Sequence, residues 1–206
     1  MTPSPLATPN ETLQSIHHRH SVRVFNDQPV SDRDLQTILD AANRAPSAHN
    51  QQSWRFIILR DKKKHGLAEL VTHRANDFPR TSAILMRMAS RSILSAPVVV
   101  AVANTGELIR RGSELFRVEE AAARDFFRTM EIQSSAAAVE NLLVAATSLS
   151  LGSVWLGIMF LMKDEVLKFL DQPAGEFMAV IPIGYPAKST EGPKKQPLEA
   201  IIRYLD

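Results

Sequence analysis

Two short stretches of the sequence carry side chains whose types and spacing could bind an anion or a polar, planar ligand. The first contains Arg19, His20, Ser21 and Arg23, which place two guanidinium groups, a titratable ring and a hydroxyl close together. Guanidinium groups hold phosphate through paired charge-assisted hydrogen bonds, and a serine hydroxyl adds another. Residues two apart share a face of an extended strand, so Arg19, Ser21 and Arg23 can point the same way. Taken alone, an exposed basic patch without a specific ligand explains these residues better.

The second stretch, APSAHNQQSWRF, runs from Ala45 to Phe56 and joins an amphipathic helix to an apolar strand. Pro46 ends the helix because its ring clashes with the preceding turn and because it lacks an amide hydrogen. The loop that follows has more hydrogen-bonding side chains than a simple connecting loop requires: Ser47, His49, Asn50, Gln51, Gln52 and Ser53. Taken alone, this stretch is also better explained as an exposed polar connector, since loops are generally polar.

Hydrophobic periodicity predicts the elements that must position these side chains. Asn10 caps a helix that ends near His18, and Ser31 with Asp34 forms a variant capping box for a helix that ends at Pro46. Apolar runs predict strands at 22–25, 54–59, 98–104, 153–158 and 178–186. Helical spacing predicts helices at 62–72, 82–95, 107–128, 130–151 and 163–170. This loose alternation indicates an α+β fold, a central sheet with helices around it.

The helix predicted at 130–151 is apolar around most of its circumference. Such a helix is either buried within one domain or part of a dimer interface, and the scarcity of polar positions favours the interface. Gly152 is the expected C-terminal stop, because glycine adopts the left-handed conformation that often ends a helix.

Composition limits the class of protein. The chain has 206 residues, of which 45% are hydrophobic, which suits a single domain at 11–206 after a flexible tail at 1–10. A net charge of +2 argues against a nucleic-acid partner, and the absence of cysteine excludes disulfides and thiolate chemistry. The apolar runs are shorter than the roughly 18 residues that a membrane span requires. We expect a soluble cytoplasmic protein.

Several catalytic motifs are absent from the sequence. It contains no GxGxxG turn, no P-loop, no HExxH and no GxSxG. A zinc site at His17, His18 and His20 is disfavoured, because Arg19 and Arg23 lie among the histidines and no nearby carboxylate completes a ligand set. We therefore expect no metal and no catalytic acid, base or nucleophile from the side chains.

The combined order of motifs resembles the nitroreductase family of FMN-dependent oxidoreductases. The N-terminal half has the basic stretch, the amphipathic helix, the APSxxNxQxWxF pattern and an apolar strand. The C-terminal half has an alanine-rich helix, then LGSVWLGI, AVIPIGYPA and GPKKQPLEAII. Together these pieces span residues 17–202 in the family's order.

The resemblance implies an α+β fold with a mainly antiparallel sheet, an intertwined homodimer and one FMN at each of two subunit interfaces. It would place Arg19, His20 and Ser21 at the FMN phosphate and ribityl chain. It would place Arg23 near flavin N1 and O2, where a fixed cation stabilises reduced flavin and raises the reduction potential. It further assigns these residues to the flavin site: Pro46, Ser47, Asn50 and Gln52 along the isoalloxazine, Trp155, Leu156, Gly157 and Ile158 across its other face with an amide near N5, and Lys194 and Lys195 at the phosphate.

The implied activity is hydride transfer from NAD(P)H through the flavin to a nitroaromatic, quinone or similar small molecule by a ping-pong mechanism. Two alternatives stay open: another flavin reaction on the same fold (dehydrogenation, dehalogenation or flavin fragmentation), or a non-catalytic FMN-binding or sensing protein. Ser53 and Ile158 stand where the family often has proline and glycine. The contacts to the flavin pyrimidine fall between Gly66 and Arg91, with Asn76 and Arg80 as candidates. Phe126 and Phe127 are either a substrate gate or part of an ordinary helix face.

Overall fold

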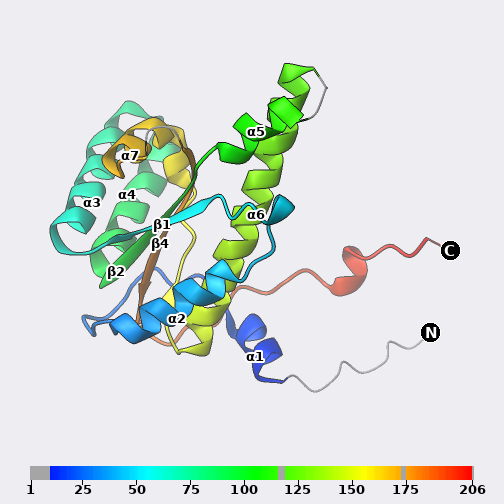
Figure 1. Cartoon of the computed structure of the whole chain (residues 1–206). Coiled ribbons are helices and arrows are strands. Elements are labelled where there is room, and N and C mark those ends of the chain that lie inside the picture. Colours follow the sequence, from blue (N-terminus) through cyan, green and yellow to red (C-terminus); the bar gives the residue numbers. More distant parts are fainter. Residues whose placement is uncertain (1–9, 116–118, 173–174, 206) are drawn as a thin grey trace.

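The computed structural model describes residues 10–115, 119–172 and 175–205 of the chain. Helices surround a four-stranded sheet (Figure 1). In chain order the helices and strands are α1 (Glu11–His18), α2 (Asp32–Asn43), β1 (Trp54–Leu59), α3 (Asp61–Arg74), α4 (Arg80–Ser95), β2 (Val98–Asn104), α5 (Glu107–Leu115), α6 (Glu120–Ser148), β3 (Gly152–Ser153), α7 (Lys163–Phe169) and β4 (Glu176–Gly184). Short 3-10 helices lie at Ala48–Asn50, Ala75–Asp77, Ile158–Met162 and Leu198–Ala200.

The sheet has the order β1-β2-β4-β3, and each neighbouring pair is antiparallel. β2 lies inside the sheet and is buried along its whole length. Its sequence VVVAVAN suits this place, because a continuous run of β-branched and small residues is typical of a strand covered on both faces. The prediction of an α+β fold with a mainly antiparallel central sheet is confirmed.

The two faces of the sheet support two separate hydrophobic cores. Val99 and Ala101 of β2 pack with α3, α4 and α7 on one face. Val98 and Val100 pack with α2 and α6 on the other face, because successive side chains of a strand point in opposite directions. Figure 1 shows α3, α4 and α7 gathered on one side of the sheet and α2 and α6 on the other. Segments that belong to different cores are therefore separated by the sheet.

The helix-capping predictions are confirmed by hydrogen bonds. The hydroxyl of Ser31 accepts from the amide of Asp34 at 3.0 Å and donates to the carboxylate of Asp34 at 2.7 Å. The side chain of Asn10 accepts from the amide of Leu13 at 3.0 Å. These contacts satisfy amides that have no partner within the first turn of each helix.

Two predicted strands are wrong in extent. The segment predicted as a strand at 22–25 forms isolated bridges at Ser21 and Phe25 instead. The strand predicted at 153–158 is reduced to β3, followed by an isolated bridge at Leu156 and a 3-10 helix. Both segments lie at the edge of the sheet, where each contacts a neighbouring backbone at one or two positions. That is too few for a continuous ladder.

The helices predicted at 107–128 and 130–151 have different boundaries in the structure. α5 ends at Leu115, residues 116–118 lie outside the described part, and α6 runs without a break through Met130. No glycine or proline lies between residues 120 and 148, so nothing interrupts this helix. Gly152 is not the helix stop: Ser150 has the positive φ of 62°, and Gly152 lies in β3 with a Cβ position only 2.8 Å from the side chain of Val22.

Candidate functional site

The basic segment at 19–25 is extended and lies beside α4 and the chain that follows α6. The amide of Val22 donates to the carbonyl of Ser153 at 3.0 Å. The hydroxyl of Ser95, the last residue of α4, donates to the carbonyl of Arg23 at 3.4 Å. These two hydrogen bonds hold the backbone of the basic segment in place.

Two side chains of this segment already have protein partners. Arg19 forms an ion pair with Glu140 of α6, with 3.4 Å between nitrogen and oxygen. The ring of His20 is held from both sides, by the carbonyl of His18 at 2.9 Å and by the hydroxyl of Thr190 at 3.0 Å. A carbonyl can only accept, so Nδ1 of His20 carries a hydrogen and donates it to His18. Ser21 and Arg23 are exposed.

A hollow of about 300 Å³ opens beside Arg23 and between α4 and the segment after β3. Apolar side chains form most of its wall, and Arg23 supplies a cation. The lining residues are Arg23, Leu85, Met88, Ala89, Ser92, Trp155, Leu156, Gly157 and Ile158. Such a site suits a flat, largely apolar ring system with a polar edge, because apolar surface is removed from water while the edge pairs with the guanidinium group.

A second hollow, of about 340 Å³, is also lined by Arg23 and has Lys188 as a further cation in its wall. The residues that line it come from the basic segment and from the start of the C-terminal tail: Ser21, Val22, Arg23, Val24, Ala187, Lys188 and Thr190. The two hollows share Arg23. One guanidinium group can therefore contact a ligand in either hollow.

The α4 wall of the first hollow was missed by sequence reasoning. Asn76 and Arg80 were the candidates in this region, and neither lines the hollow. The amide oxygen of Asn76 instead accepts from Arg87 at 2.8 Å. The lining positions 85, 88, 89 and 92 have the spacing of one helix face, so periodicity could have indicated them. Nothing in the sequence, however, shows which face of α4 meets Arg23.

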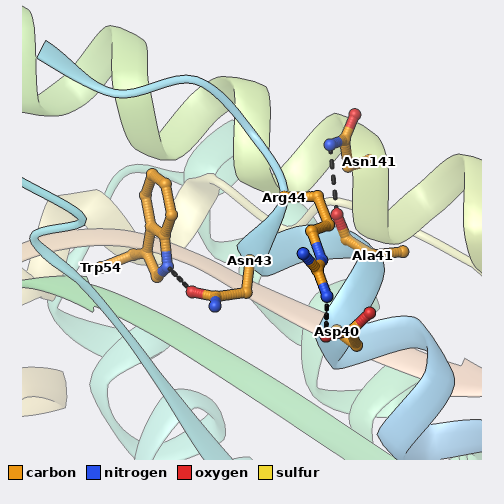
Figure 2. Close-up of polar contacts among 6 residues, drawn as sticks. All are labelled: Asp40, Ala41, Asn43, Arg44, Trp54 and Asn141. Atoms are coloured by element: carbon orange, nitrogen blue, oxygen red, sulfur yellow. Dashed lines mark hydrogen bonds and ion pairs between the residues drawn. The ribbon is translucent and has the colours of Figure 1, made fainter. Parts of the chain in front are cut away.

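The polar loop at 46–52 is fixed at its base by contacts with α2 and α6. The indole of Trp54 donates to the side chain of Asn43 at 3.0 Å, which joins the start of β1 to the end of α2 (Figure 2). Asn141 of α6 donates to the carbonyl of Ala41 at 3.2 Å. These hydrogen bonds, with the burial of Trp54, keep both ends of the loop close to α6.

Within the loop, backbone strain is balanced by local hydrogen bonds. His49, Asn50 and Gln52 have positive φ angles of 52°, 52° and 47°, a backbone conformation that residues other than glycine seldom adopt. The hydroxyl of Ser47 accepts from the amide of Gln52 at 3.1 Å, and the amide of Ala48 donates to Ser134 of α6 at 3.0 Å. Strained backbone of this kind concentrates at ligand-binding sites, where the surroundings hold a fixed conformation.

The predicted site residues fall into two groups that one chain does not bring together. Arg23 and Trp155–Ile158 meet at the first hollow, on the side of the sheet where α4 packs. The loop at 46–52 instead lies on the side of α2 and α6, and its residue Ala48 packs with α5 and α6. Lys194 and Lys195 are exposed and lie past Gly192, which backs onto His20.

A buried carboxylate fixes the helix pair formed by α5 and the start of α6, beside the polar loop. Glu131 of α6 is 1% exposed and accepts from the amide of Leu108 at 2.8 Å, in the first turn of α5. Burial raises the pKa of Glu131, and hydrogen bonds from the amides of Leu108, Gly106 and Ile109 oppose that rise. The Glu131 carboxylate therefore caps the start of α5, but its buried charge lowers the free energy of unfolding.

Glu131→Gln is expected to make the stability of the protein less dependent on pH. A raised folded-state pKa means that the stabilising effect of protonation is fully present below the unfolded pKa and is lost as pH rises through the folded value. Glutamine keeps the acceptor for Leu108 without the charge, so its advantage over glutamate should be larger at pH 8 than at pH 5. Urea unfolding at the two pH values measures this difference. Glu131→Ala, which leaves buried amides unpaired, should cost about 1–3 kcal/mol at both pH values. If the difference in stability between the Glu131→Gln variant and the wild type does not change with pH, the raised pKa of Glu131 is contradicted.

Phe126 and Phe127 lie in different environments. Phe127 is 1% exposed and packs under α5, where a Cβ on Gly112 would approach its ring to 2.2 Å. Phe126 is 52% exposed, with its ring edge-on to Phe127 at a centroid distance of 5.1 Å. Phe127 is therefore a packing residue, whereas the ring of Phe126 lies at the surface.

Within the described residues, no group of three or more histidine, aspartate or glutamate side chains is placed to hold a metal ion. In the same part of the chain, no helix combines the length and apolar character required to cross a membrane.

Comparisons with known proteins agree on one family. The model of the nitroreductase family matches residues 16–185. A predicted NADH dehydrogenase/NAD(P)H nitroreductase of Archaeoglobus fulgidus is 31% identical over 182 residues, which cover 85% of this chain and 86% of the relative. The FMN reductase [NAD(P)H] of Bacillus subtilis is 26% identical over 93% of this chain and 72% of its own length. A predicted nitroreductase from Desulfovibrio desulfuricans, solved with FMN, is 28% identical with a TM-score of 0.73, covering 97% of this chain and 99% of that one.

Proposed function

The chain belongs to the nitroreductase family, and we propose that it transfers hydride from NAD(P)H, through FMN held beside Arg23, to a nitroaromatic, quinone or similar flat acceptor. At the coarser level it is an FMN-dependent NAD(P)H oxidoreductase. The observation that supports the finer proposal is the pair of hollows that share Arg23, the second of which also has Lys188 in its wall.

The residues of the two hollows fit the parts of FMN. The apolar hollow between α4 and Trp155–Ile158 suits the isoalloxazine ring. The second hollow offers hydroxyl groups and cations for the ribityl chain and the phosphate. Arg23, between the two, would face the N1 and O2 edge of the ring system.

Bound FMN supplies the hydride chemistry, and the protein provides position and electrostatics. Arg23 places a fixed positive charge at the edge where negative charge gathers on reduction. The amide of Leu156 already donates to the carbonyl of Val180 at 2.9 Å, so the amide of Gly157 is our choice for the donor near N5. No side chain needs to act as acid or base in this scheme.

We also propose that the functional unit is a homodimer in which each site takes its polar loop from the partner copy. The loop at 46–52 lies across the sheet from the hollows of its own chain, so a second copy is the means by which both groups can contact one flavin. The C-terminal tail supports this arrangement. It runs away from the sheet (Figure 1) and exposes apolar side chains by 41–83%: Leu198, Ile201, Ile202, Tyr204 and Leu205. Exposed apolar groups of this kind mark association surfaces.

The visible spectrum of the purified protein tests the flavin proposal. We expect a yellow protein whose flavin band bleaches under anaerobic conditions when NADH or NADPH is added, and returns when a quinone or nitroaromatic is added. A colourless protein that takes up no added FMN would contradict flavin binding. A yellow protein that neither nicotinamide bleaches would instead favour another flavin reaction or a binding role.

A further inference from the structure

Both ends of the polar loop at 46–52 are hydrogen-bonded to the interior of the protein. Near its start, the amide of Ala48 donates to the hydroxyl of Ser134 on α6 at 3.0 Å. Just past its end, the carbonyl of Ser53 accepts from the amide of Thr105 at 3.0 Å. Thr105 directly follows the last residue of β2, so the loop is attached to α6 at one end and to the end of β2 at the other.

The residues beside these two attachment points are bonded to each other. Ser135 follows Ser134 in α6, and Asn104 precedes Thr105 at the end of β2. The hydroxyl of Ser135 donates to the side-chain oxygen of Asn104, and both residues are 0% exposed. This hydrogen bond therefore closes the base of the loop, at a buried position where bulk water does not compete with it.

The same region contains two buried polar atoms that have no hydrogen-bond partner within the described residues. They are Nδ2 of Asn104, which can donate, and Oε2 of Glu131, which can accept. Glu131 is 1% exposed and precedes Ser135 by four residues, so both side chains lie on the same face of α6. The other oxygen of Glu131 accepts from the amide of Leu108, four residues after Asn104. The unused donor and the unused acceptor thus belong to one polar cluster, which consists of Asn104, Glu131 and Ser135.

A buried donor or acceptor that lacks a partner costs free energy, so nearly all such groups in proteins are paired with protein or with ordered water. One water molecule can accept from an amide group and donate to a carboxylate at the same time. We propose that Asn104 and Glu131 share one internal water molecule, and that this hydrated polar cluster positions the polar loop at 46–52. Its members are buried and act through the backbone of the loop, so they are positioning residues. The positioning is a property of the fold, whereas its consequence for flavin binding rests on the proposed function.

A crystal structure that resolves ordered water tests the water site. We expect a density peak within hydrogen-bond reach, about 2.7–3.2 Å, of both Nδ2 of Asn104 and Oε2 of Glu131. A map without such a peak, or a direct hydrogen bond between the two side chains, would overturn the water site.

Hydrogen exchange of the full chain, followed by mass spectrometry, tests whether the polar cluster positions the loop. Ser135→Ala removes the donor to Asn104 and keeps Ser134, which binds the loop directly. We expect the peptide at 46–53 to exchange at least about tenfold faster than in the wild type, because local opening no longer breaks the buried contact. Exchange within α3 should change less than about twofold.

Ser90→Ala is the matched control, because it removes a buried serine hydroxyl from α4, on the other side of the sheet. Ser90 is 2% exposed and donates to the carbonyl of Ala68 in α3 at 2.9 Å. This variant should speed exchange in α3 and leave the loop peptide unchanged. The positioning role is overturned if Ser135→Ala leaves exchange of the loop peptide unaltered. It is also overturned if both variants speed exchange equally throughout the chain, since that result reflects a loss of global stability.

Titration with FMN measures the consequence for the candidate site. A loop that is in place for only part of the time lowers the apparent affinity by that fraction. Ser135→Ala should therefore bind FMN about threefold more weakly or worse, and Ser90→Ala should bind it as the wild type does. A faster-exchanging loop with unchanged FMN affinity would overturn the link between the polar cluster and flavin binding. A wild-type protein that binds no flavin would overturn the proposed function instead, and the exchange comparison would still decide whether the polar cluster positions the loop.

Discussion

Replacing Arg23 with alanine is expected to lower the flavin reduction potential and to slow reduction by NAD(P)H about tenfold or more. Arg23 is the residue that both hollows share, and no carboxylate among the described residues neutralises it. Its positive charge should therefore act directly on the bound flavin. Rapid-mixing kinetics give the rate of flavin bleaching, and a redox titration against a dye of known potential gives the reduction potential.

Two further variants show whether charge at this position is the cause. Arg23→Lys keeps the charge but not the planar fork, so it should recover much of the potential and part of the rate. Arg33→Ala removes another exposed arginine, from α2 on the opposite side of the sheet, and should change neither quantity. If Arg23→Ala has wild-type FMN affinity, potential and kinetics, Arg23 does not have the assigned role.

Two variants that are each inactive are expected to restore activity when they are combined in one dimer. Arg23→Glu puts a negative charge at the flavin edge in the hollow that the chain itself forms. Asn50→Asp changes the polar loop at 46–52 with little change of shape. Aspartate tolerates the positive φ of 52° at this position. Each homodimer should lose at least about nine-tenths of its activity, because both of its sites carry the substitution.

The heterodimer of these variants contains one site with native Arg23 and native Asn50 if the loop comes from the partner copy. With two equivalent sites in a two-fold dimer, such a heterodimer should have about half of the wild-type activity. Coexpression of the two variants with different affinity tags yields the heterodimer for assay. If both residues act in the site of their own chain, every site carries a substitution and the heterodimer stays inactive. The oligomeric state is measured separately by sedimentation.

Local sequence patterns predicted the inner strands and most of the helices, but not the boundary between α5 and α6. The capping of α2 by Ser31 depends on residues three positions apart, so the sequence contains all the information that it requires. β2 was predicted correctly because a continuous β-branched run suits burial on both faces. The edge segments at 22–25 and 153–158 were predicted less well, since their extent depends on how many partners the fold brings beside them.

The candidate site was predicted in part, and the α4 wall shows where the prediction ended. Leu85, Met88, Ala89 and Ser92 form one face of α4, and apolar residues also stand at other positions of that helix. Only packing determines that this face meets Arg23. Lys188 lines the second hollow because contacts of Ala187 and Thr190 with the basic segment hold the tail there, and these contacts join distant parts of the chain.

The order of motifs carried the resemblance to the family. The sequence by itself also determined most of the helices, the inner strands and the types of side chain that a flavin site requires. These depend on local spacing, which a single chain displays directly. The tertiary structure decided which of those side chains meet. His20 and Thr190 are 170 residues apart in the sequence and in contact in the fold. Arg23 and the polar loop at 46–52, in contrast, are close in the sequence and lie on opposite sides of the sheet. Contacts across the sheet and between distant segments arise from the packing of two cores, and no local pattern encodes them.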